Sequence, residues 1–438
     1  MNLNPKRTPF AAALLLYVGA ALAPASASAQ PATLNFQAYL DAVENHSLEL
    51  AAQRETVTAA QAGIGIAGLR PDPELTYETS RERDRGNDPR PVSRGPELSW
   101  TLETGGKRKA RIRAARSYLG LTEANLEAFR HRLYSDATSA FADACRNRQV
   151  LARNEQTLEA LNQVVRANEV RHQAGDIGGV EWLQSRVERD QFQAQVAQAR
   201  ADHAAAQLTL AVPLGQPVAL LFGDAALDCH YAPFAGGDDV EALVLAALRA
   251  RDDVLVARAT LTNASDNASL VRADRWVDPT IAVGLQTTRG YPAGIDKGGA
   301  PIEAIPRSRV LTATFSVPLP LSRFNRGELV QANAEVSQAT LELRQAELAA
   351  ETDVRAAHHQ FLAARENLER YRGGVLADAQ RMLEGIRLSY RNGASSLLEL
   401  LDAQRSADDI HLAYLQAESD LAVATVELQL AVGQRPQL

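Results

Sequence analysis

Residues 107–173 decide the fold of this chain, and they read KRKARIRAARSYLGLTEANLEAFRHRLYSDATSAFADACRNRQVLARNEQTLEALNQVVRANEVRHQ. The stretch has no proline and a single glycine, Gly120, and it ends just before a glycine-bearing turn at Gly175–Gly179. A helix of these 67 residues is about 100 Å long, because each residue adds about 1.5 Å. Helices of ordinary globular proteins are far shorter. We therefore expect an elongated, mainly helical molecule.

The chain carries this unit twice. A shift of 218 residues aligns the second copy on the first without gaps, so that Gly175 falls on Gly393 and Asp190 falls on Asp408. Such self-similarity indicates a duplicated architecture. We expect each copy to run helix, strand, loop, strand, long helix, turn, helix. The predicted division is a signal peptide (1–29), a first repeat (30–217), an equatorial linker (218–240) and a second repeat (241–438).

Proline and glycine residues mark the ends of the expected helices and strands in the first copy. They are a helix over Leu34–Leu69, a strand over Pro73–Ser80, a charged loop over 81–96, a strand over Glu97–Glu103 and, after the long helix, a helix over Val180–Val212. The helices flanking the long helix are each about half its length, so two of them stacked end to end match it.

The long helix of the second copy has a coiled-coil pattern and one weak point. Its apolar residues recur every seven positions, which predicts a packed seam; they are Val354, Phe361, Leu368, Val375 and Met382. Gly373-Gly374 interrupts it where the first copy has Glu155-Gln156. We expect a kink or a local break there. An ordinary helical-bundle core is the alternative.

The N-terminal residues predict export. Lys6 and Arg7 precede the apolar run Phe10–Ala23, and Ala27-Ser28-Ala29 forms a small-residue cleavage site, as in a secretory signal peptide. This excludes a cytosolic enzyme, and we expect no lipid anchor through an N-terminal cysteine. The whole chain has a formal charge of −7, and losing these two cations makes it more acidic, which argues against nucleic acid as a partner.

Four short segments alternate between apolar and polar residues, as strands with one apolar face do. In the second strand Leu98, Trp100 and Leu102 share a face, and in the third strand Ile281 and Val283 do. An apolar outer face with a polar inner face is typical of outer-membrane strands. A surface sheet on a soluble protein is the alternative. Four strands leave two open edges, which lipid does not tolerate, so two or three chains are needed to close a barrel.

Two further features are a pair of cysteines and a cluster of cations. Cys145 and Cys229 lie at similar heights along the expected helices, so they either form a disulfide or remain free, buried thiols. The cations at the start of the long helix face anionic lipid headgroups or solvent; they are Lys107, Arg108, Lys109, Arg111 and Arg113.

No pair of histidines has the i, i+4 spacing of a helical metal site, and no catalytic constellation stands out. We expect no metal, no cofactor and no enzyme activity.

The duplicated helix–hairpin–helix unit resembles the TolC family of outer-membrane efflux channels over essentially the whole mature chain. Two motifs are similar to its CzcC/CusC-like heavy-metal branch. One is Glu103-Thr104-Gly105-Gly106-Lys107-Arg108, and the other is Ser316-Val317-Pro318-Leu319-Pro320-Leu321 leading to Asn325-Arg326-Gly327. The resemblance implies a mainly α fold with a β-barrel part. Three chains would then build a twelve-stranded barrel in the outer membrane and a twelve-helix tunnel in the periplasm.

The resemblance also implies a function and a set of partners. A homotrimer would serve as the exit duct of a tripartite RND pump for divalent heavy metals, docked to a periplasmic adaptor and an inner-membrane RND transporter. Glu399 and Asp402 match two acidic positions that ring the closed periplasmic entrance; two solvated acids are the alternative. The expected tip and partner contacts are Arg171, Gly175, Glu181, Arg391 and Gly393. A duct for drugs or other small molecules, and a non-conducting periplasmic coiled-coil protein, are the competing hypotheses.

Overall fold

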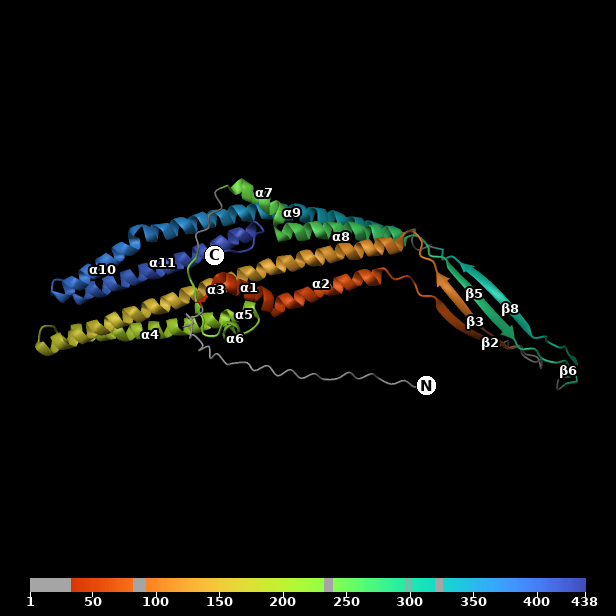
Figure 1. Ribbon diagram of the computed structural model, residues 1–438, viewed down its shortest axis with the longest axis horizontal. Helices are drawn as coiled ribbons and strands as arrows, with labels where there is room; N and C mark the ends of the chain where they lie inside the picture. The colour runs from red at the N-terminus through yellow and green to blue at the C-terminus, as the bar shows by residue number, and fades with distance from the viewer. Residues whose placement is uncertain (1–32, 82–91, 232–238, 296–297, 300, 320–325) are drawn as a thin grey trace, which may run out of the picture.

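A computed structural model describes residues 33–81, 92–231, 239–295, 298–299, 301–319 and 326–438. The molecule is elongated, with long helices at one end and a small sheet at the other (Figure 1). The expected signal peptide (1–29) and Pro320, Leu321 and Asn325 of the second motif lie outside these residues. No helix in the described part of the chain is both long enough and apolar enough to cross a bilayer.

The first half of the described chain contains both short and very long elements. In order they are β1 (Thr33–Leu34), α1 (Phe36–His46), α2 (Leu48–Ala67), β2 (Glu74–Arg81), β3 (Val92–Thr101), α3 (Lys107–Ala174), α4 (Gly179–Thr209), α5 (Ala211–Leu214), α6 (Val218–Phe222) and β4 (Ala226–Leu227).

The second half follows the same order of long elements. They are α7 (Val240–Ala250), α8 (Asp252–Asp274), β5 (Thr280–Thr288), β6 (Gly294–Ile295), β7 (Pro301–Ile302), β8 (Ser308–Ser316), α9 (Gly327–Arg370), the π-helical segment η2 (Tyr371–Val375), α10 (Leu376–Arg391) and α11 (Leu397–Ala431). The mainly helical fold with four longer strands is as predicted.

Helix α3 has the predicted length, within one residue at its C-terminal end. α2 and α4 lie end to end along it (Figure 1). The ends of this helix were predictable because the signal is local: a long run of helix formers is followed by a glycine. In the structure Gly175 has a φ of +82°, and the chain leaves the helix there. A left-handed residue at this position is readily provided by glycine.

The predicted single helix over Leu34–Leu69 is wrong, because the structure has two helices that meet at Ser47. The Ser47 N–H donates to the Val43 carbonyl and closes α1, while the Ser47 hydroxyl accepts from the Leu50 N–H and opens α2. Serine is a good N-cap residue. Continuous apolar periodicity hid this bend. The helix predicted to end at Val212 likewise stops at Thr209 and is followed by the separate α5.

The four longer strands form one antiparallel sheet in the order β2-β3-β5-β8. Its register places the predicted apolar residues on one face: Leu98 lies between Leu75 and Val283, and Ile281 lies between Trp100 and Phe315. This face is open, since Leu75 is 72 % exposed. The alternation predicted from the sequence is confirmed.

Strand β3 begins at Val92, five residues before the predicted start at Glu97. Pro96 made the earlier residues look like loop. The structure keeps Pro96 inside the strand, opposite Tyr77, and the pairing with β5 is interrupted around it and then resumes in the same register. A proline cannot donate to the ladder, so the sheet loses hydrogen bonding there without losing its direction.

The heptad seam is correct only up to the double glycine. The first three of its residues are buried; they are Val354, Phe361 and Leu368. Val375 and Met382 are exposed instead, and Leu383 is buried. Segment η2 lies between these two stretches, with Gly374 at the non-helical φ of 155°. A π turn accommodates one extra residue, so the buried face moves from Met382 to Leu383. The expected break at Gly373-Gly374 is confirmed, and its effect on the seam was missed.

The main core lies midway along the helices, where α1 and α5 pack on α3. Tyr39 and Phe141 are fully buried there, with ring centroids 5.6 Å apart. The Tyr39 hydroxyl donates to the Leu210 carbonyl at 2.9 Å. A disulfide joins Cys145 of α3 to Cys229, beside this core. It ties the segment between the two halves to the first long helix.

Candidate functional site

The two helical hairpins end in the same turn, 218 residues apart. The Asp176 N–H donates to the Arg171 carbonyl at 2.8 Å, and the Ala394 N–H donates to the Ser389 carbonyl at 2.8 Å. Each turn has a glycine with positive φ, +82° at Gly175 and +74° at Gly393. These are the hydrogen bonds of a Schellman-type helix end. The tips predicted from the repeat therefore share one local geometry.

Tyr390 joins the two tips. Its hydroxyl donates to the Asn168 amide oxygen at 2.6 Å and lies 3.3 Å from a carboxylate oxygen of Glu181. The Arg171 guanidinium lies over the Tyr390 ring, 5.3 Å from its centroid. Burial raises the pKa of Tyr390, so the phenol stays protonated and donates. The predicted tip residues Arg171 and Glu181 thus meet at an aromatic side chain of the other hairpin.

Glu399 and Asp402 are both exposed at the start of α11. Glu399 forms a capping box: its carboxylate accepts from the Ser396 N–H at 2.8 Å, and its own N–H donates to the Ser396 hydroxyl at 3.2 Å. One of these acids therefore helps to start the helix as well as carrying charge. The structure does not bring the pair to Glu181, which contacts Tyr390 instead.

The remaining tip arginines behave differently from each other. Arg387 donates to the Gln404 side-chain oxygen at 2.9 Å, whereas Arg391 is exposed. On the first hairpin, His172 stacks on Trp182 with ring centroids 5.3 Å apart, and the Arg186 guanidinium also lies over the Trp182 ring, 5.0 Å from its centroid. Each tip is thus held by planar stacking as well as by its turn.

A buried ion pair between the two halves escaped the sequence analysis. Arg153 of α3 donates to the Asp408 carboxylate of α11 at 2.7 Å and 2.8 Å, and Asp408 also accepts from Thr157 and Gln404. Asp408 is only 6 % exposed. The alignment of Asp190 with Asp408 was visible in the sequence, but its partner lies 255 residues away, and nothing local indicates that distance.

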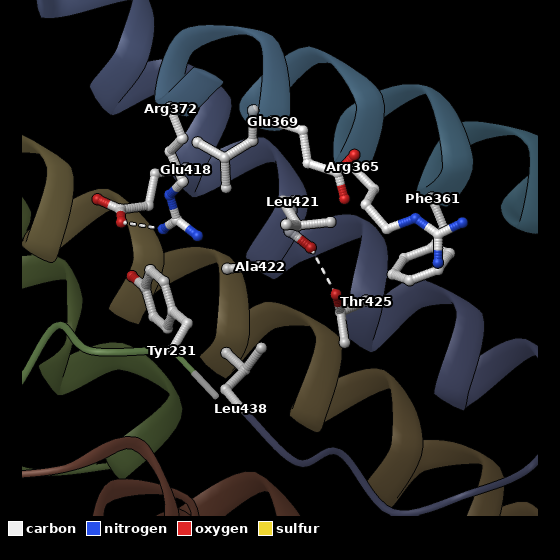
Figure 2. Close-up of a pocket in the computed structure, with 11 residues that line it drawn as sticks. Tyr231, Phe361, Arg365, Glu369, Arg372, Glu418, Leu421, Ala422, Thr425 and Leu438 are labelled. Atoms are coloured by element: carbon white, nitrogen blue, oxygen red, sulfur yellow. Dashed lines mark hydrogen bonds and ion pairs between the residues drawn. The ribbon is translucent and has the colours of Figure 1, made fainter. Parts of the chain in front are cut away.

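A hollow of about 190 Å³ lies behind the π segment, between α9, α11 and the segment that carries Tyr231 (Figure 2). Arg372 and Glu418 form an ion pair of 3.1 Å at one end. Phe361 and Leu421 supply apolar walls. Burial raises the pKa of Tyr231, whose hydroxyl has no hydrogen-bond partner among the described residues. No local signal in the sequence indicates this hollow, since its walls come from distant segments of the chain.

In the described ranges, no group of three or more histidine, cysteine, aspartate or glutamate side chains is arranged to hold a metal ion. Among the acids discussed above, Glu399 caps α11, Asp408 forms a buried ion pair and Asp402 is exposed.

The model of the family "Outer membrane efflux protein" matches residues 39–216 and 243–434. The chain belongs to the outer membrane efflux protein family. As a member, it is a TolC-like efflux channel of the outer membrane that extends into the periplasm, and it is a transport duct rather than an enzyme. This membership favours the duct over a non-conducting coiled-coil protein.

Two curated relatives and one solved structure illustrate the likeness. The cobalt-zinc-cadmium resistance protein CzcC of Cupriavidus metallidurans is 26 % identical over 394 residues, which cover 89 % of this chain and 87 % of that protein. The pyoverdine export outer membrane protein OpmQ of Pseudomonas putida is 27 % identical over 419 residues, covering 90 % and 84 %. A crystal structure of CusC superposes with a TM-score of 0.72 at 20 % identity over 91 % of this chain and 92 % of that one.

Proposed function

We propose that this outer-membrane channel is the exit duct of a tripartite RND pump that exports divalent heavy-metal cations. Three copies would form the duct and dock on a periplasmic adaptor and an inner-membrane RND transporter. The observation that carries the metal hypothesis is the likeness to CzcC over most of both chains. The exposed acids Glu399 and Asp402 add to it, because carboxylates attract cations.

The proposed gate is the start of α11. Asp402 lies three positions after Glu399, so both carboxylates lie on one helix face. In a trimer, six such groups would converge on the axis and repel one another. The proposed contact surface for the partners is the pair of tips, with Arg171, Gly175 and Glu181 on one hairpin and Arg391 and Gly393 on the other. The two repeats, 30–217 and 241–438, would each supply one hairpin, with 218–240 as their linker.

Small molecules are the second candidate substrate class. OpmQ, a pyoverdine exporter by name, is as similar to this chain as CzcC is. The two hypotheses share the same duct and differ only in the cargo that the pump delivers.

Deleting the gene tests the cargo. Growth of the deletion strain is measured with zinc, cobalt, cadmium, nickel, copper and silver salts and with a panel of hydrophobic antibiotics. Siderophore secretion is measured separately. We expect selective sensitivity to metals that the wild-type gene reverses. Sensitivity to antibiotics alone, or loss of siderophore secretion alone, contradicts the metal hypothesis and leaves the duct in place.

Conductance of the purified channel in a bilayer tests the gate. Glu399→Gln with Asp402→Asn removes both charges, and glutamine keeps the capping box because it also accepts at this position. We expect a changed conductance and a weaker response to divalent cations. Glu384→Gln with Asp409→Asn, two exposed acids of the same hairpin, is the matched control. Equal behaviour of the two double variants contradicts the gate assignment.

A further inference from the structure

Helix α3 begins with an unusual concentration of positive charge. Six of its first ten residues are lysine or arginine, and no acid occurs before Glu123. The N-terminus of a helix is the positive end of its dipole, where acids are favourable and cations are not. Lys107, Arg108 and Lys109 lie in the first turn and therefore act against the helix dipole.

Half of these cations are compensated within the molecule. Lys107 is buried and pairs with Asp278 at 2.5 Å, and Arg111 pairs with Glu103. Arg108 donates to the Gly68 carbonyl at 2.6 Å, at the C-terminal end of α2. These three side chains lie on the face of α3 that packs against its neighbours, and they hold the junction between the helices and the sheet.

The other three cations form a stripe. Lys109, Arg113 and Arg116 are spaced at i, i+4 and i+7, so they share one helix face, and all three are exposed. Within the described residues, none of them forms a hydrogen bond or an ion pair with an acid. The stripe is about 10 Å long, from the rise of 1.5 Å per residue.

Apolar surface lies directly beside the N-terminal end of this stripe, at Lys109. Lys109 and Arg70 line the same groove as Leu102, which continues the apolar face of β3. The groove has a volume of about 380 Å³. Trp276 is 64 % exposed at the same junction, where its ring packs on Gly105. Exposed apolar groups and cations thus meet at the junction between the sheet and the helices. Figure 1 shows this junction between β3 and α3.

The second half of the chain provides an internal comparison. Helix α9 starts at the matching junction, but it has Glu328 in its first turn. The residues that match the stripe at the 218-residue shift are Gly327, Gln331 and Ala334. A helix can therefore start at this junction without a basic stripe, and the architecture alone does not explain the cations of α3.

We propose that Arg70, Lys109, Arg113 and Arg116 form a junction patch that binds the headgroups of anionic phospholipids in the periplasmic leaflet of the outer membrane. The inference rests on the outer-membrane placement of the family. The headgroup layer is about 5–7 Å deep on each side of a bilayer. Lys109 would then lie within that layer, and Arg116 within a Debye length of about 8 Å. The lipid chains lie along the open apolar face of the sheet.

Counting bound lipids by native mass spectrometry tests the patch. The whole protein, purified in detergent, is titrated with phosphatidylglycerol, cardiolipin or phosphatidylethanolamine, and separately with inorganic phosphate. We expect retention of the two anionic lipids only. The triple variant Lys109→Gln, Arg113→Gln, Arg116→Gln should weaken their binding on the order of 100-fold, since a cation near an anionic surface contributes about 1 kcal/mol.

Two controls keep the test decisive. Arg166→Gln, Arg200→Gln, Arg344→Gln removes the same charge from exposed stem positions and should bind lipid like the wild type. Circular dichroism verifies that the two glutamine variants keep their helices. The second control is the charge-preserving variant Lys109→Arg, Arg113→Lys, Arg116→Lys, which should retain lipid binding. Equal binding by the two glutamine variants, equal retention of phosphatidylethanolamine, or competition by millimolar phosphate overturns the proposal.

Discussion

The long helix of the first half runs unbroken, whereas its counterpart in the second half is interrupted. α3 is a single helix over Lys107–Ala174, and the matching stretch consists of α9, η2 and α10. The interruption lies at Gly373-Gly374, where the first copy has Glu155-Gln156. The comparison shows that a small local change can alter which face of a long helix packs.

The two halves also differ in what ties them down. The disulfide engages Cys145 of α3, and the position that matches Cys145 in the second half is Ala363. The buried pair engages Asp408, whereas Asp190 pairs with its neighbour Arg189 on the surface. Duplication thus gave two similar hairpins with unequal constraints. The first half has the disulfide, the second half has the buried carboxylate of Asp408, and both differences can be tested.

The disulfide should have the largest effect. Cys145→Ala with Cys229→Ala opens a loop closed over 84 residues, which lowers the free energy of unfolding by about 4 kcal/mol. The measurement is thermal unfolding followed by circular dichroism, with and without a reductant. A reductant should lower the melting temperature of the wild type and leave the double variant unchanged. A variant as stable as the wild type contradicts the claim that the disulfide constrains the first half.

The buried ion pair comes next. Asp408→Ala leaves the Arg153 guanidinium, whose side chain is 14 % exposed, without its carboxylate, and removing one partner of a buried pair costs about 3 kcal/mol. Asp190→Ala breaks the matching exposed pair and should cost less than about 1 kcal/mol. Melting temperatures of the two variants test this contrast. Equal shifts would remove the asymmetry between the halves.

Alanine substitutions at Gly373 and Gly374 should change the free energy of unfolding in opposite directions. Gly374 has a φ of 155° that a side chain strains, so Gly374→Ala should cost about 1–2 kcal/mol. Gly373 has open space where a Cβ would be added, and Gly373→Ala should stabilise the helix by about 0.5–1 kcal/mol. Chemical denaturation of the two single variants provides the measurement. Stabilisation by both would mean that the π turn does not require Gly374.

The smallest effect concerns acid stability. Burial, followed by the charge of Arg153, lowers the pKa of His411, while Asp408 opposes this shift. As the pH falls below about 6.5, the unfolded chain takes up this proton first, so the free energy of unfolding decreases until the pH passes below the folded pKa. His411→Gln introduces the residue found at the matching position, Gln193. It should reduce the pH dependence of the melting temperature between pH 7 and 5, and an unchanged slope would argue against this role.

Much of the fold followed from the sequence because its signals are local. The ends of α3 and the alternation around Leu98 depend on neighbouring residues alone. The bend at Ser47 was missed because apolar periodicity continues through it, and the start of β3 was missed because Pro96 is a strong loop signal. Of the candidate site, the turns at Gly175 and Gly393 were visible, whereas the contact of Tyr390 with Asn168 was not.

The sequence by itself determined the duplication, the length of α3, the positions of the tip turns and the apolar face of the sheet. These properties depend on backbone preference and on periodicity, which act over a few residues. Only the tertiary structure decided that Arg153 meets Asp408, that Leu383 replaces Met382 in the packed seam, and that Lys109 shares a groove with Leu102 and Arg70. Such contacts depend on how separate helices and strands are placed in space, and packing across long sequence separations sets that placement.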